Sequence, residues 1–147
     1  TFKQMAPQSK ILHISSHALL HDQYPQYSGI VLANTNNSGF KTLFAGMGEV
    51  QPDTVEDGFL HIHELYNMQL NADLAILSAC ETGMGSYSRG EGIMSLGRGF
   101  AYAGCPSVLM SLWKANDQAG KQLMEIFNGY LRSGLDKDAA LRQGDRF

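Results

Sequence analysis

The most constraining feature of this sequence is the alternation of short apolar runs with stretches of helical periodicity. Residues 74–78 (LAILS) are nearly all apolar, as in a strand that is covered on both faces of a parallel sheet. Apolar and small residues at helical spacing follow, from Ile93 to Gly104, and a second apolar run occupies residues 107–112. A strand, a helix and a strand in this order predict a parallel pair joined by a right-handed crossover.

The remaining patterns extend the same architecture. Residues 34–58 are rich in Asn, Gly and Asp, which favours loops with room for a small hairpin. Elsewhere we expect strands at residues 11–15 and 29–33 and a helix at 61–68 with Glu64 at its third position. An amphipathic helix, which stops at Gly134, is expected to carry Leu123, Phe127, Tyr130 and Leu131 on one face. A last helix is expected at residues 136–142. Together these patterns predict an α/β fold, a three-layer sandwich with a mostly parallel central sheet.

Size and charge narrow the class of protein. A chain of 147 residues fits one domain, and 44% hydrophobic with 17% charged residues is typical of a globular chain. The net charge of -3 gives no general attraction to nucleic acid or to an anionic membrane surface. We find no apolar run of membrane-spanning length and no signal-peptide pattern in the first residues, so we expect a cytoplasmic protein.

Two residues with reactive side chains follow predicted strands. His17 comes just after the strand at residues 11–15, and Cys80 comes just after the strand at residues 74–78. Active sites of open α/β sheets lie beyond the carboxyl ends of the strands, so the two side chains are expected to meet there. A buried free cysteine is more often an inert small hydrophobe, and the pair alone is therefore weak support for a catalytic site.

The chemistry of this pair is that of a cysteine nucleophile. A thiol attacks efficiently only as thiolate, and an adjacent imidazole both removes its proton and later protonates the leaving amine. The backbone N–H groups of Cys80 and of Ala18 are expected to point into the same cleft and to hold the developing oxyanion.

A long segment around Cys80 resembles a known family. The stretch LAILSACETGMGSYSRGEGIMSLGRGFAYAGCPSVLMSLW, residues 74–113, is similar to the core signature of CHAT domains, which belong to the caspase, separase and gingipain clan of cysteine peptidases. Upstream, ILHISSHALL resembles the family's strand and catalytic-histidine element, and SGIVLAN resembles the strand that follows. The resemblance covers most of residues 11–141 and implies a caspase-like fold and a cysteine endopeptidase activity without cofactor or metal.

The resemblance also implies roles for individual residues. His17 matches the family's general base and Cys80 its nucleophile, with Ala18 where the clan often has Gly. Ser111 and Trp113 match positions that line the substrate groove, where a peptide binds in extended form. Glu81, directly after the nucleophile, is a further candidate for substrate binding, because its carboxylate would favour basic side chains of the substrate.

The end of the chain departs from the family pattern. After ALRQ the family continues into a last strand rich in aromatic residues, whereas this chain reads GDRF. We therefore expect a single CHAT-type peptidase domain over residues 1–147 that lacks the usual last strand and is a fragment of a larger protein. CHAT domains commonly follow helical repeats that receive a signal, so the implied partners are a protein or peptide substrate and a regulatory helical-repeat region.

Several alternatives remain beside this interpretation. His13 lies on the same face of an ideal strand as His17, and a structural role is favoured for it. His61 and His63 invite a metal site, but no dense Cys/His spacing supports one, and Cys105 is expected to be buried packing. Among functions, a catalytically silent interaction module and a Cys-dependent hydrolase or transferase with a non-peptide acyl substrate compete with the endopeptidase.

Overall fold

The computed structural model describes residues 1–19, 28–32, 58–81, 89–111 and 117–144; the side chains of Leu19, residues 79–81, residues 89–93 and Asp117 are outside this description. The chain divides into two compact units, Thr1–Leu112 and Trp113–Phe147. The loop prediction for residues 34–58 falls almost entirely outside the described residues.

The first unit is built on a mixed sheet. The five described strands are β1 (Ile11–Leu19), β2 (Gly29–Val31), β3 (Phe59–His61), β4 (Leu74–Glu81) and β5 (Val108–Met110), in the order β3-β2-β1-β4-β5. β4 runs parallel to both β1 and β5, whereas β2 is antiparallel to β1 and to β3. The predicted α/β class is confirmed, with antiparallel pairing on one side of β1 that the sequence did not predict.

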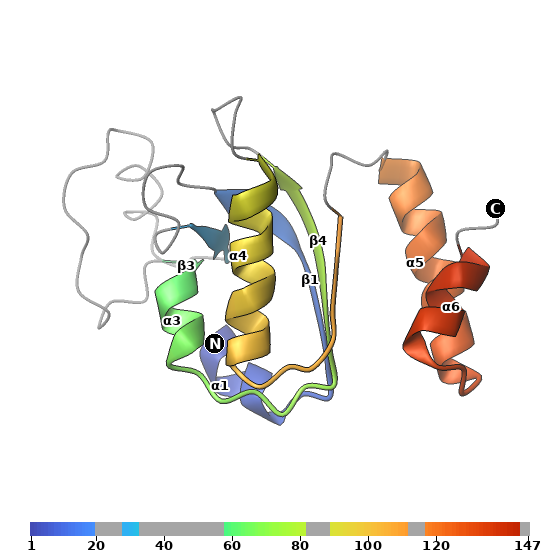
Figure 1. The fold of residues 1–147 in the computed structure, drawn as a ribbon, viewed down its shortest axis with the longest axis horizontal. Coiled ribbons are helices and arrows are strands. Elements are labelled where there is room, and N and C mark those ends of the chain that lie inside the picture. Colours follow the sequence, from blue (N-terminus) through green and yellow to red (C-terminus); the bar gives the residue numbers. More distant parts are fainter. Residues whose placement is uncertain (20–27, 33–57, 82–88, 112–116, 145–147) are drawn as a thin grey trace. The chain divides into compact units, whose positions relative to one another are not determined.

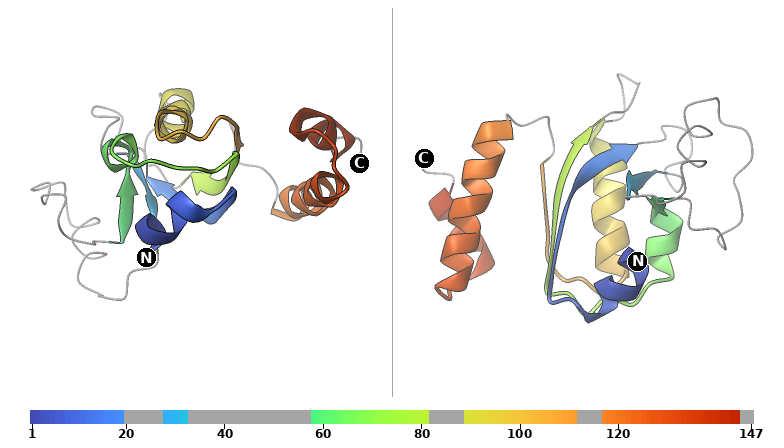
Figure 2. Two further views of the ribbon diagram at one scale, coloured as in Figure 1. Left: turned by 90° about the horizontal axis from the view of Figure 1, so that it is seen from below. Right: turned by 180° about the vertical axis from the view of Figure 1, so that it is seen from behind.

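Three helices and a 3₁₀ turn accompany this sheet (Figure 1). They are α1 (Phe2–Met5), the turn η1 (Ala6–Gln8), α3 (Ile62–Tyr66) and α4 (Arg89–Tyr102). The helix predicted at residues 61–68 is thus present in a shorter form, and the helix predicted before Gly104 is present and begins earlier. Figure 2 shows α3 and α4 on the same side of the strands.

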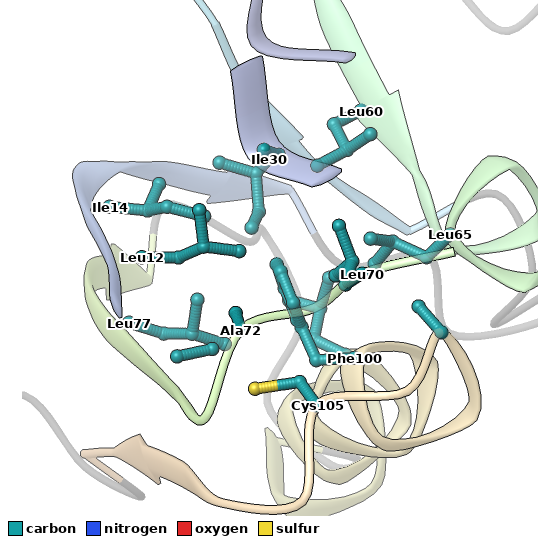
Figure 3. Close-up of a cluster of buried hydrophobic side chains, with 14 of the residues drawn as sticks. Leu12, Ile14, Ile30, Leu60, Leu65, Leu70, Ala72, Leu77, Phe100 and Cys105 are labelled. Atoms are coloured by element: carbon teal, nitrogen blue, oxygen red, sulfur yellow. The ribbon is translucent and has the colours of Figure 1, made fainter. Parts of the chain in front are cut away.

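Strand periodicity explains which face of β1 these helices cover. Leu12, Ile14 and Ala18 are buried, whereas His13 and His17, at the intervening positions, are exposed. The buried side chains belong to one hydrophobic cluster, which also includes residues of neighbouring strands and of α3 and α4 (Figure 3). The other members include Ile30, Leu60, Ile62, Leu65, Leu70, Ala75, Leu77, Leu96, Phe100 and Cys105. One face of β1 therefore faces the core and the other remains accessible.

The start of α3 is held by a charged side chain. His61 precedes the helix in an extended conformation, and its backbone N–H donates to Glu64 Oε2 at 2.8 Å. The other carboxylate oxygen, Glu64 Oε1, lies 2.5 Å from Lys3 Nζ in α1. Glu64 occupies the third helical position, as predicted, and it joins the N-terminal helix to the edge of the sheet.

The helix α4, which connects β4 to β5, is followed by a glycine in a left-handed conformation. Gly104 has φ +103, and the next N–H, of Cys105, donates to the carbonyl of Phe100 at 3.0 Å. A Cβ atom at Gly104 would lie 2.8 Å from the carbonyl oxygen of Leu70. Glycine is needed here both for its backbone conformation and for close packing against the segment before β4.

The second unit contains two helices that pack against each other, α5 (Asp117–Arg132) and α6 (Lys137–Gly144). Gly134, with φ +88, lies in the turn between them. On α6, Arg142 Nη2 donates to Asp138 Oδ2 at 2.5 Å. This hydrogen bond is the main reason why the pKa of the exposed Asp138 carboxyl lies below its usual value of 3.8, with the backbone N–H of Ala139 contributing next.

Candidate functional site

The two residues chosen from the sequence as a catalytic pair are neighbours in the central parallel ladder. β1 and β4 align so that His17 is the register partner of Cys80, and Ala18 is the register partner of Glu81. Adjacent strands lie about 4.8 Å apart, so residues in one rung are close in space. Among the predicted site residues, the structure thus brings the backbones of His17 and Cys80 together; the side chain of Cys80 is outside the described part.

Both residues lie within their strands rather than after them, which corrects the predicted strand ends. β1 continues to Leu19 and β4 to Glu81, because the parallel ladder persists beyond Ser15 and Ser78. The polar composition of these last rungs is compatible with a strand because one face of β1 is accessible to solvent. Ser15 and His17 are outward-facing residues of the strand, whereas Ser16 lies on the core-facing side and is half-buried.

Alternate rungs of this ladder face opposite sides of the sheet. Leu12 pairs with Ala75 and Ile14 pairs with Leu77, and these four residues belong to the hydrophobic cluster. Successive strand residues point to opposite faces, so the rungs between them have the opposite orientation. His17 belongs to this second set of rungs, and its side chain is exposed.

A side-chain hydrogen bond joins β1 to β4 on the face opposite the hydrophobic cluster. His13 Nε2 lies 3.3 Å from Ser78 Oγ, diagonally across two rungs, with His13 exposed and Ser78 half-buried. The spacing of His13 and His17 along a strand already indicated a shared face, but the partner on β4 was missed. Nothing in the sequence sets the register between the two strands, and the register is what brings Ser78 within reach of His13.

Ala18 is buried, in contrast to the exposed His17 beside it. It is 3% exposed, and it is a register partner of Ile30 on β2 as well as of Glu81 on β4. Next to it, the hydroxyl of Ser16 donates to the carbonyl of Val31, which ties the end of β1 to β2. The backbone expected to bind an oxyanion is therefore part of two ladders.

The residues predicted to bind substrate are described only in part. Ser111 follows β5 directly and is half-buried. Trp113 lies outside the described residues, and the same is true of the side chain of Glu81. The prediction that these three residues line one groove therefore stays a prediction.

His61, His63 and Cys105 make contacts that are typical of structural residues. The rings of His61 and His63 stack with centroids 5.2 Å apart, and within the described ranges no group of three or more His, Cys, Asp or Glu side chains is arranged to hold a metal ion. Cys105 is fully buried, and its thiol donates to the carbonyl of Ser107 at 3.3 Å. The prediction that Cys105 is buried packing is confirmed.

The fold and the ladder define an α/β domain in which a histidine and a cysteine share one rung of a parallel strand pair. A protein-family model described as CHAT domain matches residues 1–146. The chain belongs to the CHAT domain family. No curated protein and no solved structure matches the chain, and no helix in the described ranges is both long and apolar enough to cross a membrane.

Proposed function

We propose that this domain is a cysteine endopeptidase in which His17 activates Cys80. The observation that supports this proposal most directly is the rung that His17 and Cys80 share in the β1–β4 ladder. Paired positions of neighbouring strands belong to the same face of a sheet, and the side chain of His17 is exposed at this rung. Membership of the CHAT family, whose motif both residues match, adds to this support.

The reaction follows from the chemistry of a thiol beside an imidazole. His17 accepts the proton of the Cys80 thiol, and the thiolate attacks the carbonyl carbon of the scissile peptide bond. When the tetrahedral intermediate collapses, the C–N bond breaks, and the imidazolium gives its proton to the departing amine. Water, deprotonated by His17, then hydrolyses the thioester and restores the free thiol.

Stabilisation of the oxyanion is assigned to backbone N–H groups at the same strand ends. The candidates are the N–H of Cys80 and the N–H of Ala18. Because Ala18 pairs with both β2 and β4, its participation requires this end of β1 to open when substrate binds. The half-buried Ser111 after β5, together with Glu81 and Trp113, is proposed to line the groove for an extended peptide.

The wider setting of the domain is also part of the proposal. Residues 1–147 are proposed to form a single, caspase-like peptidase domain with a three-layer sandwich. It acts in the cytoplasm on a protein or peptide substrate, without a cofactor, under the control of an adjacent sensor or helical-repeat region. It has no direct role in nucleic-acid or membrane binding.

Cleavage of co-expressed proteins tests the activity. The domain, expressed with its native neighbours, is compared with the Cys80→Ala and Cys105→Ala variants for cleavage of candidate partner proteins, read by mass spectrometry of new termini. Wild type and Cys105→Ala are expected to produce the same new termini, and Cys80→Ala none, because only Cys80 supplies the nucleophile. Equal cleavage by wild type and Cys80→Ala would refute the endopeptidase.

A catalytically silent interaction module is the alternative. The position of Ala18, buried in two ladders and without the glycine common in the clan, favours it because this backbone is not open to an oxyanion. Such a module would bind its partner equally well as wild type and as the Cys80→Ala variant, with no cleavage in either case. The endopeptidase predicts instead that the partner accumulates uncleaved only with the variant.

A further inference from the structure

The outer surface of α3 and α4 carries large apolar side chains that take no part in the core. Tyr102 is 80% exposed, Met94 51% and Tyr66 45%, whereas Leu96 and Phe100, on the inner side of α4, belong to the hydrophobic cluster. A single exposed apolar side chain is normal on a protein surface, but a contiguous group of them marks a site of interaction. The packing of the two helices decides whether these side chains adjoin.

α3 and α4 lie side by side and bring two tyrosines together (Figure 1). Gly99 of α4 is close to α3, because a Cβ atom added there would lie 3.1 Å from Leu65 Cδ1. Tyr66 and Tyr102 are the last residues of the two helices, and their rings meet edge to face with centroids 5.4 Å apart. The two tyrosines therefore form one aromatic surface that spans both helices.

Helical spacing continues this surface along α4. Met94, Arg98 and Tyr102 follow one another at intervals of four residues, so they form one row about 12 Å long on the helix. All three side chains are exposed. Rows with this spacing are the ridges against which a second helix packs. We call Met94, Arg98 and Tyr102, together with Tyr66, the α3–α4 surface.

The charge on the α3–α4 surface comes from one guanidinium group. Arg98 has no hydrogen bond or ion pair within the described ranges. The described acid of the two helices is Glu64, whose side chain is 12% exposed and contacts Lys3 and the N–H of His61 instead. A guanidinium beside aromatic side chains favours a partner that supplies a carboxylate and disfavours a partner that supplies a second cation.

We propose that the α3–α4 surface binds an amphipathic helix of another protein, and that this helix carries a carboxylate on its apolar face. Tyr66, Tyr102 and Met94 provide the apolar contact area, and Arg98 pairs with the carboxylate. Aromatic residues, Met and Arg are the types enriched at protein interfaces, and a helix presents its anchors one turn apart, as the row on α4 does. The inference is independent of the proposed peptidase activity.

A second copy of the chain is a poorer occupant of the same surface. A twofold contact is self-complementary, so both partners would use the same residues. Such a contact would bring two Arg98 guanidinium groups into one small interface, without a described carboxylate to separate them. The charge therefore favours an acidic partner over self-association.

Selection from a displayed peptide library tests the proposal. The library consists of amphipathic helical peptides in which one position of the apolar face is Glu, Gln or Lys in equal amounts, and the bait is the full chain with its native neighbours. The Kd of enriched peptides is then measured by fluorescence polarisation for wild type, Arg98→Gln, Arg98→Glu and Tyr102→Ala. Arg132→Gln is the matched control, because Arg132 is an exposed arginine at the end of α5.

Wild type and Arg132→Gln are expected to enrich peptides with Glu at the varied position and to bind them with equal Kd. Arg98→Gln should weaken this binding about tenfold or more, as loss of a hydrogen bond between charged groups does. Arg98→Glu should reverse the preference and enrich peptides with Lys. Tyr102→Ala should weaken binding about thirtyfold, as expected at an interface hot spot.

The reversal of charge decides the proposal even if Tyr102→Ala disturbs α4, because the side chain of Arg98 is exposed and makes no contact that folding needs. An Arg98→Glu variant that still prefers Glu, or a wild type without any preference at the varied position, would overturn it. A dimer in analytical ultracentrifugation that Tyr102→Ala dissociates would assign the surface to a second copy and overturn it as well. None of these results bears on cleavage by Cys80, which the comparison with Cys80→Ala tests separately.

Discussion

Along β1, a single step in register would exchange the two faces of the strand. His13 and His17 share the accessible face, and the intervening Leu12, Ile14 and Ala18 are buried. A slip of one residue would move these three apolar side chains into solvent and both histidines into the core. The apolar residues of β1 thus determine which face of the strand carries the histidines, although they take no part in the chemistry.

Gly29 shows how closely the antiparallel edge of the sheet is packed. A Cβ atom there would lie 2.6 Å from the carbonyl oxygen of Leu60 and 3.1 Å from Cα of His61. We predict that Gly29→Ala lowers the free energy of unfolding by about 1–3 kcal/mol, as overpacking of a well-packed core does. Urea unfolding followed by circular dichroism measures the change.

Gly129 provides the matched control for this substitution. It lies inside α5, and an added Cβ would meet no atom within 4 Å. Gly129→Ala should therefore raise stability by about 0.5–1 kcal/mol through helix propensity. Equal effects of the two substitutions would show that the contact of Gly29 with β3 is not a constraint.

Among the secondary structure elements, those with enough residues to show a period were predicted from the sequence. The apolar run of β4 and the helical spacing in α4 identified a strand, a crossover helix and the following strand β5. α1, η1 and β3, with three or four residues each, were missed because they show neither a repeat nor an extended apolar run. β2 and β5 are as short, but they lie within the longer apolar runs at residues 29–33 and 107–112. The candidate pair was likewise predicted from strand order, whereas the strand ends and the His13–Ser78 contact depend on register, which no local pattern contains.

Glu64 connects α1, α3 and the edge of the sheet through one carboxylate. It accepts the N–H of His61 at 2.8 Å and lies 2.5 Å from Lys3, with only 12% of its side chain exposed. We predict that Glu64→Ala costs about 1–2 kcal/mol of unfolding free energy, because both contacts are lost, and that Glu64→Gln costs less because its amide oxygen still caps α3. Urea unfolding tests both.

Glu125 is the control for this prediction. It pairs with Lys121 four residues earlier on α5 at 3.8 Å, and 66% of its side chain is exposed. Glu125→Ala should change stability by less than about 0.5 kcal/mol, as is usual for surface pairs. A cost for Glu64→Ala as small as that for Glu125→Ala would contradict the proposed connection between the helices.

The pair on α6 predicts a pH dependence with a definite sign. The hydrogen bond from Arg142 holds the pKa of Asp138 below 3.8, so the charged carboxylate favours the folded helix above that pH, and this contribution is lost as the pH falls through the lowered pKa. Arg142→Met should raise the pKa of Asp138 toward 3.8, measured by NMR titration of the carboxyl carbon. A pKa that stays unchanged in this variant would show that Arg142 is not the cause.

Taken as a whole, the chain comprises two compact units, and the candidate pair belongs entirely to the first. His17 and Cys80 lie on adjacent strands of the Thr1–Leu112 unit, and the hydrophobic cluster beneath β1 and β4 is in the same unit. The rung that carries the candidate pair is thus supported by one continuous core. The prediction of a single domain over residues 1–147 awaits a measurement of how the two units unfold.

The reaction of Cys80 with a peptide-derived electrophile tests the proposed dyad most directly. The folded domain with its native neighbours is incubated with an acyloxymethyl ketone carried on a short peptide, and the rates of labelling at Cys80 and Cys105 are measured by mass spectrometry. The account predicts fast labelling at Cys80, a loss of at least about a hundredfold in His17→Ala, as expected for removal of a general base, and no labelling of the buried Cys105. Labelling of Cys80 at the same rate with and without the imidazole of His17 would contradict it.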